Sequence, residues 1–320
     1  MPMSCRWTMQ CERWTKWQFD MTHPCPPPRL PSVYRTYTQA ELDAQYNNQA
    51  KISVPKFQEF VRECAVSSAQ ARGRWRAHLN QRYGALDGQI LDIFMPDRLH
   101  QDAPVEIFLH GGYWRMFGKD DFSYVANGFA PHGIITIVVN YMLIPTVSLD
   151  ALVGQCQEAV VWTYRHIRDF GGNPDNLFLS GHSAGGHLTA LLLSLDWSTY
   201  DGHCPIRGAT AISGIFDLEP IRLSYLNSTL GFTREVAARN SPILLPAPDI
   251  PLDLHVGDKE GDEYIRQSAA LAHAWRKGRC PPVLHVQARE DHFSIRAQLG
   301  VPNSGLVKSM LEKRIVVGAR

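Results

Sequence analysis

Cysteine is sparse in this sequence, and its spacing excludes two common architectures. The 320 residues contain 7 cysteines, an odd number, and no two of them form a Cys-x-x-Cys pair. Disulfide scaffolds carry dense, even sets of cysteines, and structural zinc sites need closely spaced ones. We therefore expect a protein of a reducing compartment, the cytoplasm, that uses neither a metal nor another cofactor.

Concentrated charge and long apolar runs are also missing. The 32 Lys and Arg residues nearly balance the 31 Asp and Glu residues, for a net charge of +1. Nucleic acids and anionic membranes attract a concentrated basic face. A membrane-spanning helix needs about 18 apolar residues in a row, and the longest apolar stretch, residues 133–147, is interrupted by Asn140 and Pro145. The sequence thus predicts a small-molecule substrate and no nucleic-acid or membrane partner, and it is compatible with a homodimer.

The sequence does contain an alternation of short apolar runs and amphipathic segments. Residues 1–33 read as an irregular arm, residues 39–75 as an N-terminal helical segment, and residues 82–96 as one or two antiparallel edge strands. Continuous apolar runs separated by helices are typical of a parallel sheet that is buried on both faces. We therefore expect a single α/β domain over residues 34–320, with a mainly parallel, doubly wound sheet and helices on both faces. Strands are expected at 104–110, 134–141, 176–180, 209–215, 252–256 and 283–286, and helices at 148–170, 184–195 and 262–276.

A candidate nucleophile lies in a glycine-bounded turn. The segment GHSAGG, residues 181–186, follows an apolar strand and opens a helix with an apolar face. A serine at the tip of a tight strand-to-helix turn has a strained backbone, so its neighbours two positions away must lack side chains. We therefore predict that Ser183 is the nucleophile of an α/β-hydrolase fold.

A candidate oxyanion loop follows an earlier strand. The segment HGGYW begins at His110, and backbone N–H groups can approach a substrate oxygen only where side chains are absent. We expect Gly111 and Gly112 to form this loop, together with the N–H of Ala184, the residue after the nucleophile. His110 is expected to brace the loop. Tyr113 and Trp114 are candidates for the wall of the substrate pocket, or alternatively pack the loop onto the core.

The general base is predicted from chain order, because the triad of this fold runs serine, acid, histidine. His292 lies in REDHF, directly after the last apolar strand and before a helix, which is the position of the base. His255 and His285 fall inside strand patterns and are expected in the core.

The acid should follow the preceding strand, where residues 254–260 read LHVGDKE. Both Asp258 and Glu260 are candidates. A carboxylate that orients the imidazole must lie beyond the strand end. The two extra residues favour Glu260, and Asp258 stays the alternative.

These motifs together resemble the kynurenine formamidase (arylformamidase) family of serine α/β-hydrolases, which is related to the hormone-sensitive-lipase-like esterases. The resemblance spans about residues 35–316. It rests on HGGYW, the segment from Asn140 to Pro145, GHSAGGHL, the stretch EGDEYIRQS at residues 260–268, and the terminal DHF. HGG-x-W and GHSAGG occur in many esterases, whereas the EGDEYIRQS stretch is more particular and supports Glu260 as the acid. The resemblance implies metal-independent hydrolysis of N-formyl-L-kynurenine to L-kynurenine and formate.

Two other functions remain open at this point. A carboxylesterase of broad specificity on small acyl esters would use every one of the same residues. A catalytically silent hydrolase fold that only binds ligands would usually have lost a triad residue, and all three positions are filled here.

Overall fold

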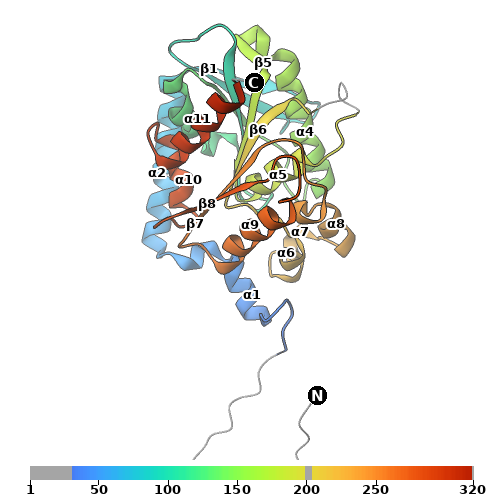
Figure 1. Cartoon of the computed structure of the whole chain (residues 1–320). Coiled ribbons are helices and arrows are strands. Elements are labelled where there is room, and N and C mark those ends of the chain that lie inside the picture. The colour runs from blue at the N-terminus through green and yellow to red at the C-terminus, as the bar shows by residue number, and fades with distance from the viewer. Residues whose placement is uncertain (1–30, 199–203, 319–320) are drawn as a thin grey trace, which may run out of the picture. The chain divides into compact units, whose positions relative to one another are not determined.

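The centre of the molecule is an eight-stranded sheet (Figure 1) with the order β1-β2-β4-β3-β5-β6-β7-β8. The computed structural model describes residues 31–198 and 204–318, and their side chains up to residue 312. The arm expected over residues 1–33 therefore lies almost entirely outside the described residues. The strands are β1 Arg76–Arg82, β2 Ile90–Met95, β3 Ala103–Leu109, β4 Ile135–Val139, β5 Gly172–His182, β6 Ile206–Ile212, β7 Leu252–Gly257 and β8 Val283–Gln287.

The predicted sheet type is confirmed. β1 pairs antiparallel with β2, and β2 pairs antiparallel with β4. All the pairings from β4 through β3 to β8 are parallel. The antiparallel pairs thus lie at one edge, as the sequence pattern indicates, and the remaining strands point their carboxyl ends in one direction.

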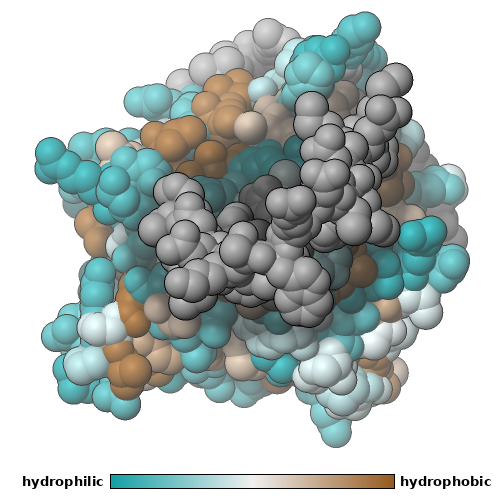
Figure 2. Space-filling model, turned by 90° about the horizontal axis from the view of Figure 1, so that it is seen from below, coloured by the Kyte–Doolittle hydropathy of each residue, from teal (hydrophilic) through white to brown (hydrophobic). Residues whose placement is uncertain are grey.

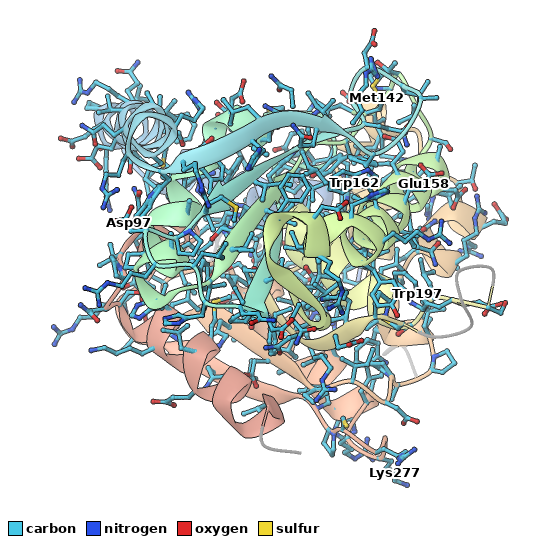
Figure 3. The ribbon with its side chains drawn as sticks, turned by 90° about the horizontal axis from the view of Figure 1, so that it is seen from above. Asp97, Met142, Glu158, Trp162, Trp197 and Lys277 are labelled. Carbon is cyan, nitrogen blue, oxygen red and sulfur yellow. The ribbon has the colours of Figure 1, made fainter. Side chains whose placement is uncertain are left out.

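Helices cover both faces of the sheet, as Figure 1 shows and as Figure 3 shows from above. On one face lie α2 Val54–Arg74, α3 Ala126–Phe129, α10 Ser294–Ala297 and α11 Gly305–Gly318. On the other face lie α4 Leu149–His166, α5 Ala184–Leu193 and α9 Asp262–Ala274. Near one end of the sheet, at the bottom of Figure 1, lie α1 Gln39–Tyr46, α6 Glu219–Leu223, α7 Asn227–Leu230 and α8 Arg234–Arg239.

Alternation along the central strands builds the two cores. In β3, Ile107 and Leu109 face the core under α4 and α5, whereas Phe108 faces the core under α3 and α11. All three side chains are fully buried, and each such burial is worth about 1.5–3 kcal/mol. The sheet is therefore a rigid platform whose strand ends can hold side chains in fixed positions.

Polar contacts fasten two helices at the sheet edge (Figure 3). Glu158 of α4 accepts a hydrogen bond from the Gln89 amide, just before β2. At the left of the same view, Asp97 pairs with Arg74 at the end of α2.

The helical segment expected over residues 39–75 consists of two α-helices, α1 and α2, and Pro55 lies in the first turn of the second. A short 3₁₀ helix, η1 Asn48–Lys51, separates α1 from α2. The side chain of Asn47 caps η1, and that of Ser53 caps α2 ahead of Pro55. Each cap satisfies backbone N–H groups that a helix start leaves without partners, so the break is encoded locally. Among the residues described, no helix is long and apolar enough to cross a membrane.

Candidate active site

Ser183 lies at the carboxyl end of β5, where the chain turns sharply into α5. Its backbone has φ 58° and ψ −119°, a strained conformation for a residue with a side chain. Its N–H donates to the Ile212 carbonyl at 2.8 Å. A Cβ atom at Gly181 would lie 2.3 Å from the Gly185 carbonyl oxygen, and one at Gly185 only 2.0 Å from that of Leu109. The flanking glycines are therefore required by space, as the motif predicts.

His292 and Glu260 complete a hydrogen-bonded line with this serine. The Nε2 atom of His292 lies 3.1 Å from Ser183 Oγ, and its Nδ1 atom lies 2.7 Å from Glu260 Oε2. Ser183 and His292 remain 4% and 8% exposed, respectively, so both are screened from bulk water without being sealed off. This is the geometry in which an imidazole can accept the serine proton while a carboxylate stabilises the resulting imidazolium.

The second oxygen of Glu260 is also held. Its Oε1 atom accepts hydrogen bonds from Ser213 Oγ and from the backbone N–H of Gly257. Asp258, the alternative acid, instead accepts a hydrogen bond from the backbone N–H of Arg289 at 2.7 Å. The structure therefore brings Glu260, and not Asp258, to His292.

The glycines of HGGYW lie against the nucleophile. A Cβ atom at Gly111 would lie 2.8 Å from the His182 carbonyl oxygen and 3.1 Å from Ser183 Cβ. Gly112 has φ +117°, and a Cβ atom there would lie 2.3 Å from the Met116 carbonyl oxygen. Ala184 is the first residue of α5, and the N–H groups of a first helical turn have no partner within the helix. The three predicted donors thus belong to segments that meet around Ser183.

His110 lies behind this loop. Its ring stacks on Tyr141 with centroids 4.2 Å apart, and its Nδ1 atom lies 2.8 Å from the Gly111 carbonyl oxygen. Burial lowers the pKa of His110 to about 4, so the ring is neutral near pH 7. These contacts agree with the expected role of a brace.

Tyr113 and Trp114 lie in different surroundings, and the expectation that Trp114 lines the substrate pocket is wrong. Tyr113 lines the cavity above Ser183. Trp114 is fully buried, with its ring packed against His187 and Phe232. Both residues have positive φ angles, 49° and 58°, so the chain turns between them and sends the second side chain inward. The indole N–H donates to His187 Nδ1 at 3.2 Å, which satisfies the polar atom that a buried tryptophan carries.

The EGDEYIRQS stretch fastens the N-terminal helices to the site. Tyr46 at the end of α1 donates to Glu263 at 3.0 Å and accepts a hydrogen bond from the Gln267 amide. Gln267 also accepts from the backbone N–H groups of Phe216 and Asp217. The EGDEYIRQS stretch therefore links α1, α9 and the loop after β6.

A cavity of about 330 Å³ opens over Ser183 and His292. Its walls come from α1, η1, α2, α10, the loop after β3 and the turn between α6 and α7. They include Asn48, Phe57, Phe60, Tyr225 and Arg296. The volume lies within the usual range for small-ligand sites. Figure 2 looks onto the end of the molecule at which α1 and α6 lie, where small hydrophobic groups lie among hydrophilic side chains.

Several residues around His292 were not predicted from the sequence. The rings of His182 and Tyr264 each lie 4.6 Å from the ring of His292, and Ser213 binds Glu260. Tyr264 stands within the EGDEYIRQS stretch, so that motif could have identified it. His182 lies within GHSAGG, but that motif does not specify the residue before the serine. Ser213 follows β6 directly and lies in no motif.

The two histidines expected in the core differ from each other. His255 is 1% exposed, as expected. The side chain of His285 is 34% exposed, because β8 is the edge strand of the sheet. The expectation of a core position is therefore wrong for His285.

Strained serine elbow, histidine, carboxylate and glycine loop occur together at the carboxyl ends of parallel strands. This combination of fold and site defines a serine hydrolase of the α/β-hydrolase class. A family model described as BD-FAE matches residues 91–218, which include the glycine loop and the serine elbow.

Known proteins narrow the class further. The chain is 31% identical to a kynurenine formamidase of Danio rerio over 88% of this chain and 98% of that protein. It is 35% identical to a kynurenine formamidase of Salmo salar over 72% of this chain and 79% of that protein. A solved structure from Silicibacter sp. TM1040, described as a thioesterase, is 28% identical with a TM-score of 0.73, covering 84% of this chain and 98% of that one. The chain belongs to the kynurenine formamidase family.

Proposed function

We propose that the protein hydrolyses N-formyl-L-kynurenine to L-kynurenine and formate through an acyl-enzyme on Ser183. The observation that carries this proposal is the line Ser183–His292–Glu260, with distances of 3.1 and 2.7 Å, in a chain that aligns with two kynurenine formamidases over most of their length. Site and family thus support the same reaction, the cleavage of a formyl amide.

In the proposed mechanism, His292 takes the proton of Ser183 as Oγ attacks the formyl carbon. The N–H groups of Gly111, Gly112 and Ala184 face the oxygen on which negative charge develops, and each such donor is typically worth about 3–4 kcal/mol. Glu260 stabilises the imidazolium of His292.

His292 next returns the proton to the nitrogen of the leaving arylamine, and the C–N bond breaks. The same imidazole then removes a proton from water, whose oxygen attacks the carbonyl carbon of the formyl-serine. The bond from that carbon to Ser183 Oγ breaks, formate leaves, and His292 gives the proton to Oγ, which restores the free enzyme.

A carboxylesterase activity is the second candidate, and the esterases among the relatives favour it. The chain is 32% identical to the esterase LipQ of Mycobacterium tuberculosis over 36% of this chain. An ester needs the same nucleophile, base and oxyanion donors, so the two activities differ only in leaving group. A silent binding fold is disfavoured, since no member of the triad is missing.

The deciding experiment compares kcat/KM for N-formyl-L-kynurenine with kcat/KM for p-nitrophenyl acetate, using the wild type and Ser183→Ala. We expect the formyl amide to be the better substrate and Ser183→Ala to lower both activities by about 10⁴-fold or more. Full turnover by Ser183→Ala would disprove the acyl-enzyme. A clear preference for the ester would replace the formamidase by the esterase.

We further propose that the protein acts in the cytoplasm as a single hydrolase domain over residues 34–320, without a nucleic-acid partner. The scattered cysteines and the near-zero net charge of +1 support this. A homodimer is the proposed oligomeric state, and sedimentation equilibrium against a monomer mass of 36.1 kDa tests it.

A further inference from the structure

In the part of the chain that the structure describes, Arg296 has no acidic partner, although it lies in the wall of the cavity. Arg296 of α10 lines the same cavity as Ser183 and His292, yet it is only 7% exposed. Among the residues that the structure describes, no carboxylate lies within ion-pair distance of its guanidinium, and its Nε atom is buried without a hydrogen-bond partner. Its Nη2 atom donates to Cys64 Sγ at 3.4 Å, and a thiol is a weak acceptor.

Aromatic rings hold this guanidinium in place. Its central carbon lies 4.5 Å from the ring centroid of Phe60 on α2 and 4.9 Å from that of Phe122. Such cation–π contacts are favourable, but they do not satisfy N–H donors. The contacts therefore position a planar, permanently charged fork and leave part of its hydrogen-bonding capacity unused.

A buried charge without a counter-ion is costly, because neither water nor an acid compensates for its desolvation. A ligand that brings a carboxylate into the cavity would remove that cost and could bind the fork through two hydrogen bonds. The second arginine of the cavity wall, Arg115, also has a buried Nε atom without a partner. Arg115 is more exposed, however, and its Nη1 atom already donates to Thr229 Oγ1 at 3.1 Å. We propose that Arg296 binds a carboxylate of the substrate and so selects substrates whose leaving group carries one.

This inference rests on the proposed function, which supplies such a group. The leaving arylamine of N-formyl-L-kynurenine carries an amino-acid side chain that ends in an α-carboxylate, whereas simple esters and formanilides do not. Formate, the other product, is also a carboxylate, so the experiment must distinguish the two sources.

The test compares N-formyl-L-kynurenine with N-formylkynuramine, which keeps the formanilide and the side-chain amine but lacks the carboxylate. For the wild type we expect kcat/KM to be about 10–100-fold higher for the carboxylate substrate, the usual worth of a charged hydrogen-bonded contact. In Arg296→Met this ratio should fall to about 1, with activity on N-formylkynuramine and p-nitrophenyl acetate within about threefold of wild type. Arg296→Lys keeps the charge but not the fork, so its ratio should be intermediate.

Arg115→Met is the matched control, a cationic residue of the same cavity wall. It should leave the ratio between the two formyl substrates unchanged. The inference is overturned if the wild-type ratio is near 1, if Arg296→Met lowers activity on all substrates in parallel, as loss of packing between Phe60 and Phe122 would, or if Arg115→Met abolishes the ratio instead. A change confined to inhibition by formate would assign the cation to the product and would also overturn it.

Inhibition of ester hydrolysis separates this inference from the proposed function. L-Kynurenine should inhibit the wild type more strongly than kynuramine, and the two should become equal in Arg296→Met. If neither formyl amide is hydrolysed but this difference is seen, the formamidase proposal fails and the carboxylate site stands. Equal inhibition of the wild type by both amines overturns the carboxylate site whatever the reaction. Should Arg296→Met not fold, the two wild-type comparisons and Arg296→Lys decide.

Discussion

The hydroxyl groups of Tyr113 and Tyr264 lie 2.6 Å apart, joining the glycine loop to α9. Tyr264 accepts a hydrogen bond from the Asn48 amide at 2.8 Å, and Tyr113 donates to the Tyr46 carbonyl at 2.6 Å. Because each hydroxyl both donates and accepts, the hydrogen bonds run in one direction from Asn48 to Tyr46. The chain thereby connects the N-terminal helices, the loop beside Ser183 and the ring that packs on His292.

Replacing Tyr264 by Phe removes the middle of this chain and keeps the ring beside His292. We expect the free energy of unfolding to fall by about 1–2 kcal/mol, since two buried hydrogen bonds are lost, and kcat for p-nitrophenyl acetate to fall several-fold. Urea unfolding and steady-state kinetics measure both. Tyr225→Phe is the control, because no hydrogen bond of its hydroxyl is found in the described structure, and it should change stability by less than about 0.5 kcal/mol. Equal effects of the two substitutions would contradict a role for the chain.

The choice between the two acids can be tested by paired substitutions. Glu260→Gln removes the charge that faces His292 Nδ1 at 2.7 Å and should lower kcat by about 10³–10⁴-fold, as in other triads. Asp258→Asn affects a contact with the backbone of Arg289 and a long ion pair with Lys259, neither of which involves His292, and should lower kcat less than about threefold. The reverse order of these two effects would make Asp258 the acid.

Gly112 is predicted to tolerate no side chain. Its φ is +117°, and only 2.3 Å would separate an added Cβ atom from the Met116 carbonyl oxygen, so Gly112→Ala must displace the loop. We expect kcat to fall by about 10²–10³-fold, the usual effect of losing an oxyanion donor. Gly154→Ala in α4 is the matched control: nothing lies within 4 Å of the added methyl group, and it should stabilise the protein by about 0.5–1 kcal/mol. Unchanged turnover in Gly112→Ala would remove this loop from the mechanism.

His187 makes stability depend on pH. Its Nδ1 accepts from Trp114, and its Nε2 lies 2.7 Å from the Asn240 carbonyl oxygen, an arrangement that only the neutral ring satisfies. Burial lowers the pKa of His187 from 6.5 to about 4. In the unfolded chain His187 binds a proton below about pH 6.5, whereas in the folded protein it does so only below about pH 4. The free energy of unfolding therefore falls as the pH falls from 6.5 to 4. From pH 7 to pH 5 the loss is about 2 kcal/mol for this one residue.

The corresponding variant is His187→Gln, followed by urea unfolding at pH 7 and pH 5. The difference in unfolding free energy between the two pH values should shrink by about 2 kcal/mol. It should not vanish, because burial also lowers the pKa values of His110 and His182. An unchanged difference would show that His187 does not resist protonation.

The sequence predicts those parts of the fold that depend on residues close to one another along the chain. The runs that form β3 to β7 are largely apolar and buried, which is typical of a parallel sheet covered on both faces. The strain at Ser183 requires the glycines by which the turn is recognised. Glu260 and His292 are predictable because the fold places acid and base after particular strands.

The walls of the cavity follow no such pattern. Tyr46 and Glu263 meet across 217 positions of sequence, and no periodicity encodes that contact. The helices α6, α7 and α8 contain 5, 4 and 6 residues, too short to be stable alone, so packing and not propensity forms them. The position of Trp114 could not be predicted, because two consecutive positive φ angles reverse the direction in which neighbouring side chains point.

The hydrogen bonds that join α1 to α9 also bear on how this enzyme could diversify. Nucleophile, base and acid belong to the sheet, whereas part of the cavity wall comes from residues 46–61, a stretch that precedes every strand. Exchange of this stretch between relatives would present a new surface to the leaving group while leaving the reacting groups in place. Residues 46–61 can therefore change during evolution, and alter which leaving groups fit, while the strands that position the reacting groups stay the same.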